Sequence, residues 1–174
     1  EAEWEYACRA GTTTRFSFSD SDLPLGEYAW FDGNTDAARQ DYAHLVRQKK
    51  PNPWGLYDVH GNVLEWCSDY YDEKYYANSP SVDPSGPPSG ISHSVRGGAW
   101  DHGQSYLRSA YRSDYRVSRG LLVGFRVVSG GKTISDGAAL PIALESVIER
   151  PKAGDDKVKA QDGAPIAVKV PPKE

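Results

Sequence analysis

Hydrophobic residues are spread over the first 128 residues in short groups, and few groups keep one periodicity for long. Residues 1–10 are an exception, because Trp4 and Cys8 lie four positions apart and would share one face of a helix. Gly11 follows, and glycine commonly ends a helix. The pattern therefore predicts that the chain opens with the end of a helix.

Several other segments alternate in the manner of strands. They lie around Phe16 and Phe18, at 44–47, at 93–100, at 106–112 and at 121–128. The segment 121–128 is almost continuously apolar, which is typical of a strand at the centre of a sheet. Residues 61–69 fit either a short helix or a tight loop. Together these segments predict an α+β fold.

The segment 51–66, PNPWGLYDVHGNVLEW, is rich in large apolar side chains but follows neither the helical nor the strand period. A segment this apolar must be buried, and its irregular backbone must still find hydrogen-bond partners. Gly55 and Gly61 can adopt the positive φ that tight turns require. We therefore expect a core built largely from ordered loops, with little regular secondary structure.

Composition divides the 174-residue chain into two parts. Every tryptophan, tyrosine and phenylalanine lies at or before Phe125. Residues 129–174 are rich in lysine, aspartate, alanine and proline, and such a composition rarely forms a core. We therefore predict a folded domain at 1–128 and a low-complexity linker or disordered tail at 129–174.

Charge and hydropathy narrow the classes of partner. A formal net charge of −4 argues against nucleic acid as the main partner. No apolar run approaches the roughly 20 residues that a membrane-spanning helix needs. The chain begins at Glu1 and contains no methionine, so we expect a native amino-terminal portion to precede it.

The thiol and imidazole side chains show no metal-binding spacing. Cys8 and Cys67 could be two buried thiols, a disulfide or a reactive pair, and the sequence leaves these alternatives open. The histidines are not spaced so that three would meet at one metal ion. They are His44, His60, His93 and His102.

Four arginines stand between apolar neighbours near the end of the predicted domain. They are Arg96, Arg108, Arg112 and Arg126. Arginine in such a position usually pairs with a buried carboxylate and organises the loops around it. Glu3, Glu5 and Asp69 are the candidate partners.

The strongest candidate for a metal site is the turn that contains Asp58, Gly61, Val63 and Glu65. Two carboxylates flank a glycine turn whose carbonyl groups can also bind a cation, and oxygen ligands of this kind suit Ca²⁺. The alternative is that both carboxylates accept hydrogen bonds from backbone N–H groups without any metal.

The order of the motifs is characteristic. EAEWEYACRAGT is followed by YAWFDGN, QKKPNPWGLYDVHGNVLEWCSDYY, VRGGAWD, RSAYR and GFRVV. This series resembles the formylglycine-generating enzyme family, also called sulfatase-modifying factor domains, over about residues 1–128, the carboxy-terminal two-thirds of such a domain. The resemblance implies a loop-rich, C-type-lectin-like variant of the α+β fold that is stabilised by calcium. The calcium ligands of the family correspond to Asp58, Gly61, Val63 and Glu65.

The catalytic part of the family pattern is missing. Members that make formylglycine carry two copper-binding cysteines between the GG motif and the RxAxR segment. Here the interval reads AWDHGQSYL, without cysteine, so we expect no copper and no catalytic residues of that kind. The sequence leaves open whether the chain is an enzyme of another type.

Two hypotheses about function follow. In the first, the chain is a binding or accessory module of a larger multidomain protein, and an extracytoplasmic or secreted location is slightly favoured by the resemblance. Its ligand groove for a peptide or small molecule would include Trp100, Asp101, His102, Ser105, Tyr106 and Arg112. In the second, the chain is an oxidoreductase that uses another metal site or an upstream module.

Overall fold

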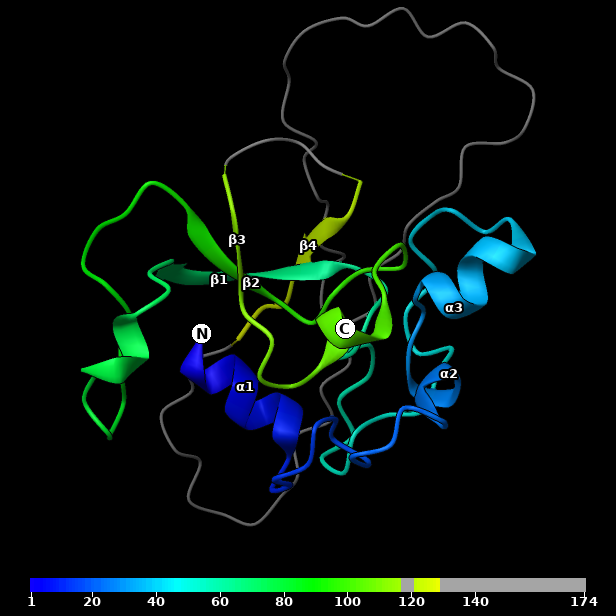
Figure 1. Cartoon of the computed structure of the whole chain (residues 1–174), viewed down its shortest axis with the longest axis horizontal. Helices are drawn as coiled ribbons and strands as arrows, with labels where there is room; N and C mark the ends of the chain where they lie inside the picture. The colour runs from blue at the N-terminus through cyan, green and yellow to red at the C-terminus, as the bar shows by residue number, and fades with distance from the viewer. Residues whose placement is uncertain (117–120, 129–174) are drawn as a thin grey trace, which may run out of the picture. The chain divides into compact units, whose positions relative to one another are not determined.

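The computed structural model describes residues 1–116 and 121–128 (Figure 1). The linker or tail that the sequence predicts at 129–174 lies outside these residues. Among the helices of the described part, none combines the length and apolar character needed to cross a membrane.

A four-stranded mixed sheet forms the centre of the domain, in the order β3-β2-β1-β4. The strands are β1 (Leu64–Tyr70), β2 (His93–Arg96), β3 (Ser113–Tyr115) and β4 (Val123–Phe125). The pairs β1–β2 and β2–β3 are antiparallel, whereas β1 and β4 are parallel. With its few short helices, the domain has the α+β fold that the sequence predicts.

The helices are all short. They are α1 (Ala2–Arg9), α2 (Leu25–Tyr28), α3 (Asp32–Thr35) and the 3₁₀ turns η1 (Asp36–Ala38), η2 (Tyr75–Ala77) and η3 (Gln104–Leu107). The prediction of an opening helix is confirmed. Helix α1 ends at Ala10, whose φ of 48° is left-handed and whose N–H bonds to the Tyr6 carbonyl.

Several predicted strands were wrong. The segment around Phe16 forms no strand: the Phe16 N–H donates to the Ser19 carbonyl and the Arg15 N–H to Asp20, in a local turn. Residues 44–47 form a loop and turn, and 106–112 begin in η3 rather than in a strand. Among the described residues, none of these three segments belongs to a strand of the sheet.

Two further assignments change. Residues 61–69, expected to be a short helix or loop, mostly belong to β1, because the positive φ values of Gly61 and Asn62 turn the chain directly into the strand. Strand β4 lies at an edge of the sheet and not at its centre. Val123 packs on the core, but Phe125 is 75% exposed, so the apolar run has one covered and one open side.

Two small apolar clusters fill the interior of the domain. One contains Phe16, Leu25, Ala29 and Leu107. The other lies on the sheet and contains Leu64, Val95 and Ala99. Because both clusters are small, polar contacts must hold much of the remaining structure.

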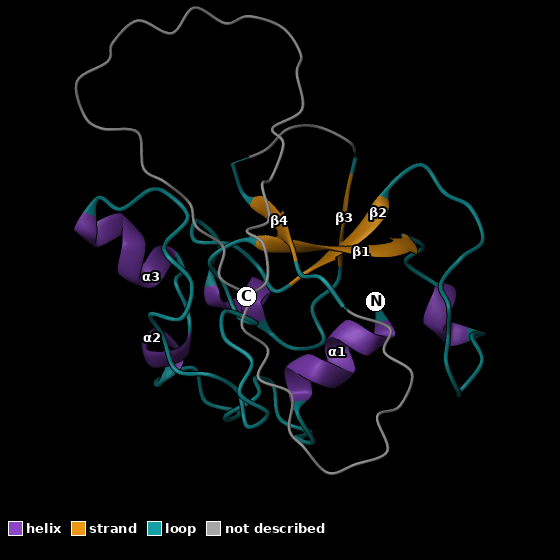
Figure 2. Ribbon diagram, turned by 180° about the vertical axis from the view of Figure 1, so that it is seen from behind, coloured by secondary structure: helices purple, strands orange, loops and turns teal. Residues whose placement is uncertain are grey.

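Figure 2 shows the ribbon of helix α1 and the strands of the sheet. Buried charges join this helix to the sheet. Arg96 on β2 is 1% exposed and donates to Glu1 at 2.8 Å and to Glu5 at 2.6 Å. Arg112 also donates to Glu1, at 2.7 and 2.9 Å. Burial raises the pKa of Glu1, but the hydrogen bond from Arg112 and the charge of Arg96 outweigh it and lower the pKa to about 2.

The predicted pairing of arginines with carboxylates is confirmed for three of the four. Arg126 donates to Glu65 at 2.7 and 3.0 Å. Arg108 instead donates to the carbonyl of Ser105 at 2.8 Å. Of the three proposed acidic partners, Glu5 pairs with an arginine of this group, namely Arg96.

Candidate functional site

The turn before β1 has a left-handed backbone at several positions. Asp58 has φ 57°, Gly61 has φ 75° and Asn62 has φ 63°. At Gly61 a Cβ atom would lie 2.1 Å from the carbonyl oxygen of Trp30, so only glycine fits. The backbone of this turn, between Asp58 and the start of β1, is therefore fixed in one conformation.

The two carboxylates of this turn lie in different environments. Asp58 accepts the backbone N–H of Arg47 at 2.8 Å, and burial, with the charge of Glu65 as a smaller cause, raises its pKa. Glu65 accepts two hydrogen bonds from Arg126 and a third from the Trp4 indole N–H at 2.7 Å. Glu65 is thus part of the buried network that also holds α1.

Of the four predicted calcium ligands, Asp58, Gly61 and Val63 precede β1 and Glu65 lies in it, and their binding of one ion stays a prediction. Burial acts to lower the pKa of Arg126, but the charge and hydrogen bond of Glu65, together with the charge of Asp58, outweigh it and raise the pKa. Arg126 pairs directly with Glu65, whereas Asp58 accepts a hydrogen bond from the backbone N–H of Arg47. Among the described residues, no three histidine, cysteine, aspartate or glutamate side chains gather as a metal-binding group, so carbonyl oxygens would have to complete the site.

Part of the predicted ligand groove forms a small exposed cluster at η3. His102 Nε2 lies 3.8 Å from Asp101 Oδ1. The His102 ring is 5.1 Å from that of Tyr106, which in turn contacts Tyr111 edge-on at 5.1 Å. Tyr106 is 43% exposed, so this cluster can be reached from solvent.

The remaining groove residues have different surroundings. Trp100 is half-buried. Its backbone N–H donates to the Asn62 carbonyl at 3.0 Å, and its backbone carbonyl accepts a hydrogen bond from the Thr35 hydroxyl at 2.8 Å. Ser105 is exposed beside Tyr106 in η3. Within the described residues, the buried Trp100 indole N–H has no hydrogen-bond partner.

Arg112 belongs to another cluster. Its guanidinium binds Glu1 and stacks over the rings of Tyr71 and Tyr76, at 5.1 and 4.6 Å from their centroids. The carbonyls of Asp72 and Glu73 accept from the same side chain. Arg112 therefore contacts Glu1, the 71–76 segment and two of its tyrosine rings, whereas the other predicted groove residues have different contacts.

Both cysteines are free and buried. Burial raises the pKa of Cys8 to about 12 and that of Cys67 to about 11. A thiol with so high a pKa stays protonated near neutral pH, and the protonated form is neither a nucleophile nor a good metal ligand. Of the alternatives that the sequence left open, the structure shows two buried thiols.

His60 is a core histidine. Its Nδ1 lies 2.7 Å from the Leu107 carbonyl, which can only accept, so Nδ1 carries the proton. Its Nε2 then accepts the Ser17 N–H at 3.1 Å and contacts the Ser17 hydroxyl at 2.9 Å. Burial lowers the pKa of His60 to about 4, so the ring is neutral at physiological pH.

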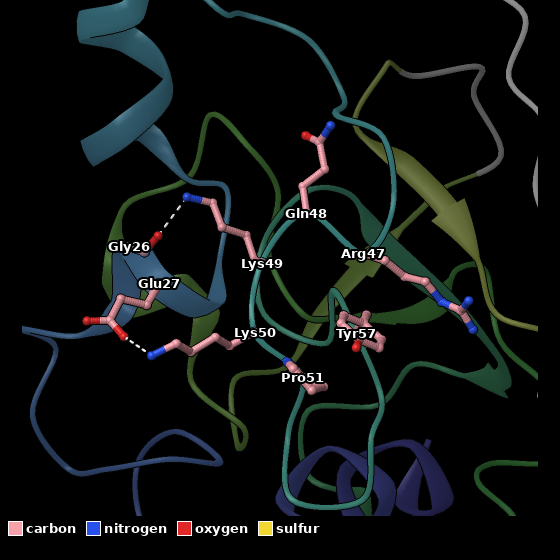
Figure 3. Close-up of a pocket in the computed structure, with 8 residues that line it drawn as sticks. All are labelled: Gly26, Glu27, Arg47, Gln48, Lys49, Lys50, Pro51 and Tyr57. Atoms are coloured by element: carbon pink, nitrogen blue, oxygen red, sulfur yellow. Dashed lines mark hydrogen bonds and ion pairs between the residues drawn. The ribbon is translucent and has the colours of Figure 1, made fainter.

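A pocket that the sequence reasoning missed lies between α2 and the segment 47–51 (Figure 3). It has a volume of about 790 Å³ and is open to solvent. Its walls are Gly26, Glu27, Arg47, Gln48, Lys49, Lys50, Pro51 and Tyr57. The signal in the sequence was the run RQKK at 47–50, which holds three cations in an acidic chain.

The fold and these sites define a loop-built α+β domain organised by a glycine turn and buried arginine–carboxylate pairs. The family described as "Sulfatase-modifying factor enzyme 1-like domain" matches residues 1–130. The chain therefore belongs to the sulfatase-modifying factor family, as the motif order indicated.

Relatives of the chain include formylglycine-generating enzymes and protein kinases. It is 39% identical over 127 residues to a formylglycine-generating enzyme of Streptomyces coelicolor, covering 68% of this chain and 38% of that protein. It is 34% identical to the serine/threonine-protein kinase pkn1 of Chlamydia caviae, covering 76% of this chain and 21% of the kinase. The chain thus spans less than half the length of these relatives.

Solved structures support the same family fold. Treponema denticola variable protein 1 superposes with a TM-score of 0.65 at 36% identity, over 71% of this chain and 44% of that protein. PvdO from Pseudomonas aeruginosa superposes with a TM-score of 0.61 at 28% identity, over 71% and 48% of the two chains.

The environment of His60 predicts a pH dependence of stability. Its pKa is about 4 in the folded chain against an ordinary 6.5, so the unfolded chain binds more protons as the pH falls between these values. The free energy of unfolding should therefore be highest above about pH 6.5 and should fall by about 3 kcal/mol in total as the pH is lowered towards 4. Urea unfolding at several pH values measures this slope.

The variant His60→Gln should flatten the slope, whereas His93→Gln, on the half-exposed face of the sheet, should retain it. A wild-type slope that persists in His60→Gln would show that other groups are responsible.

Proposed function

We propose that this chain is an atypical, C-type-lectin-like sulfatase-modifying factor domain that binds a ligand or assists a larger protein and does not oxidise cysteine. The observation that supports this proposal most strongly is that the interval 99–107, between the GG motif and RSAYR, contains no cysteine. Oxidation of a substrate thiol at copper would need soft thiolate ligands in that interval.

The state of the two existing thiols supports this proposal. Cys8 lies in α1 and contacts the Val59 carbonyl and His60 Nε2, each at 3.9 Å. Cys67 is buried on β1, and its pKa is raised like that of Cys8. Neither thiol is exposed at the η3 cluster, so neither can replace the missing pair there.

An accessory role also agrees with the relatives. The kinase pkn1 contains a related segment that makes up about a fifth of its length, so the domain occurs within larger proteins. In this chain the exposed cluster of Asp101, His102, Ser105 and Tyr106 offers a carboxylate, an imidazole, a hydroxyl and an aromatic ring. Such a mixture suits a peptide or a small polar molecule, because it combines hydrogen-bonding groups with a stacking surface.

The proposal predicts that the chain fails to make formylglycine. Incubated with copper, oxygen, a thiol reductant and a cysteine-containing peptide, it should leave the peptide mass unchanged and consume no oxygen above the protein-free blank. The Streptomyces coelicolor relative serves as the positive control. Peptide oxidation that disappears in Cys8→Ala or Cys67→Ala would show that a buried thiol is catalytic and would refute the proposal.

We further propose that a calcium ion stabilises the turn from Asp58 to Glu65. The two carboxylates, with the carbonyls of Gly61 and Val63, supply hard oxygen ligands. The raised pKa of Asp58 reflects its burial and, as a smaller cause, the nearby charge of Glu65. A divalent cation between the two carboxylates would offset this repulsion and favour the ionised form of Asp58.

Calcium should therefore raise the melting temperature of the wild-type chain relative to chelator, since a ligand that binds the folded state stabilises it by mass action. Asp58→Asn should abolish this difference while leaving the Glu65–Arg126 pair in place. Asp101→Asn, which removes an exposed carboxylate elsewhere, should retain it. Identical melts of the wild-type chain in chelator and in millimolar calcium would reject the site.

A further inference from the structure

Strand β4 has one edge that no other strand of the described residues covers. On its covered side, the Leu64 N–H donates to the Leu122 carbonyl at 2.7 Å, and Gly124 continues this parallel ladder. In a parallel pair, alternate residues of a strand direct their backbone groups to the same neighbour. Leu122 and Gly124 therefore face β1, whereas the N–H and C=O groups of Val123 and Phe125 point outwards along the open edge.

The side chains beside this edge are apolar and open to solvent. Leu121 is 89% exposed, Phe125 is 75% exposed and Val127 is 58% exposed. Because side chains alternate between the two faces of a strand, these three lie on one face together with Val123. Proteins that remain monomeric usually protect an apolar edge of this kind, because it can pair with the strand of another chain.

Charge distinguishes β4 from the strand at the other edge of the sheet. Strand β3 carries the exposed Asp114 and is followed by the exposed Arg116, and such charges discourage pairing at an edge. Within 121–128 the charged residue is Arg126. By the same alternation it lies on the opposite face of β4, where it binds Glu65 at 2.7 Å. A strand that pairs with β4 therefore meets no free charge from this segment.

These properties define the partner strand. It must be extended, apolar and without charge on the side that faces β4, and among the edge strands of the described sheet β4 itself meets these requirements. A two-fold axis at Gly124 would place Val123 opposite Phe125 of a second copy, and Leu121 opposite Val127. All four residues have outward-pointing backbone groups, and glycine, which has no side chain, stands at the axis.

We propose that the chain forms a two-fold dimer in which the β4 strands of two copies pair antiparallel and join the two sheets into one. The pairing satisfies the outward backbone groups of Val123 and Phe125 and removes the apolar face of the strand from water. Each copy has one such edge, so association closes at two copies. The contact is small, so we expect a weak dimer, with a dissociation constant on the order of 10–100 µM.

Sedimentation velocity of the 174-residue chain, from about 5 to about 500 µM, tests the proposal. The wild-type chain should change from monomer to dimer over this range. Phe125→Glu should weaken association about tenfold or more, because each copy would bring a charge into the apolar contact. Phe125→Leu keeps an apolar side chain at this position and should still dimerise.

Leu23→Glu is the matched control for the added charge. Leu23 is 92% exposed and lies before α2, outside the sheet, so this variant should dimerise within about twofold of the wild-type chain. A monomer across the whole concentration range would overturn the proposal. Leu23→Glu that weakens association as much as Phe125→Glu would also overturn it.

Hydrogen exchange of the wild-type chain tests the strand pairing without any substitution. The amides of Val123 and Phe125 point outwards in the monomer, so they should exchange more slowly at the concentration where the dimer predominates. The exposed amide of Leu23 should exchange at the same rate at both concentrations. A dimer in which Val123 and Phe125 exchange as fast as in the monomer would show that the copies associate elsewhere and would refute the pairing of β4.

Discussion

The rest of the structure depends on the buried guanidinium of Arg96. Helix α1 places one fully buried side chain, Cys8, against the domain, so apolar contact alone holds it weakly. Arg96 joins this helix to β2 through Glu1 and Glu5, and its third partner is the Ser109 carbonyl at 2.7 Å. A buried charge is tolerated only when its partners are in place, so helix, strand and loop must assemble together.

Arg126 repeats this arrangement close by, because its partner Glu65 lies directly across from Arg96 on the neighbouring strand. It binds Glu65 on β1, and Glu65 also accepts the indole N–H of Trp4 from α1. Residues of the VRGG, GFR and LEW motifs therefore serve to connect α1 with the sheet. This explains how the family scaffold can persist in a chain that lacks the copper-binding cysteines: the motifs that define the fold and the interval that carries the chemistry are separate.

The sequence predicted those features that depend on local chemistry. The end of α1 and the pairing of arginines with carboxylates follow from residue types that have few other ways to be satisfied. Strands were predicted less well, because pairing depends on distant segments: the alternation around Phe16 is satisfied by local turns, and β4 lies at an edge despite its apolar residues. The charge of Lys49 was visible in the sequence, but its position between Gly26 and Trp30 was not.

The central role of the buried charges is tested most directly by the free energy of urea unfolding of two arginine variants. Arg96→Met should lose about 3–5 kcal/mol, because Glu1 and Glu5 would be left near the core without their shared cation. Arg9→Met removes the partially exposed helical partner of the same Glu5 and should lose less than about 1 kcal/mol. Equal losses in the two variants would contradict the dependence of the fold on Arg96.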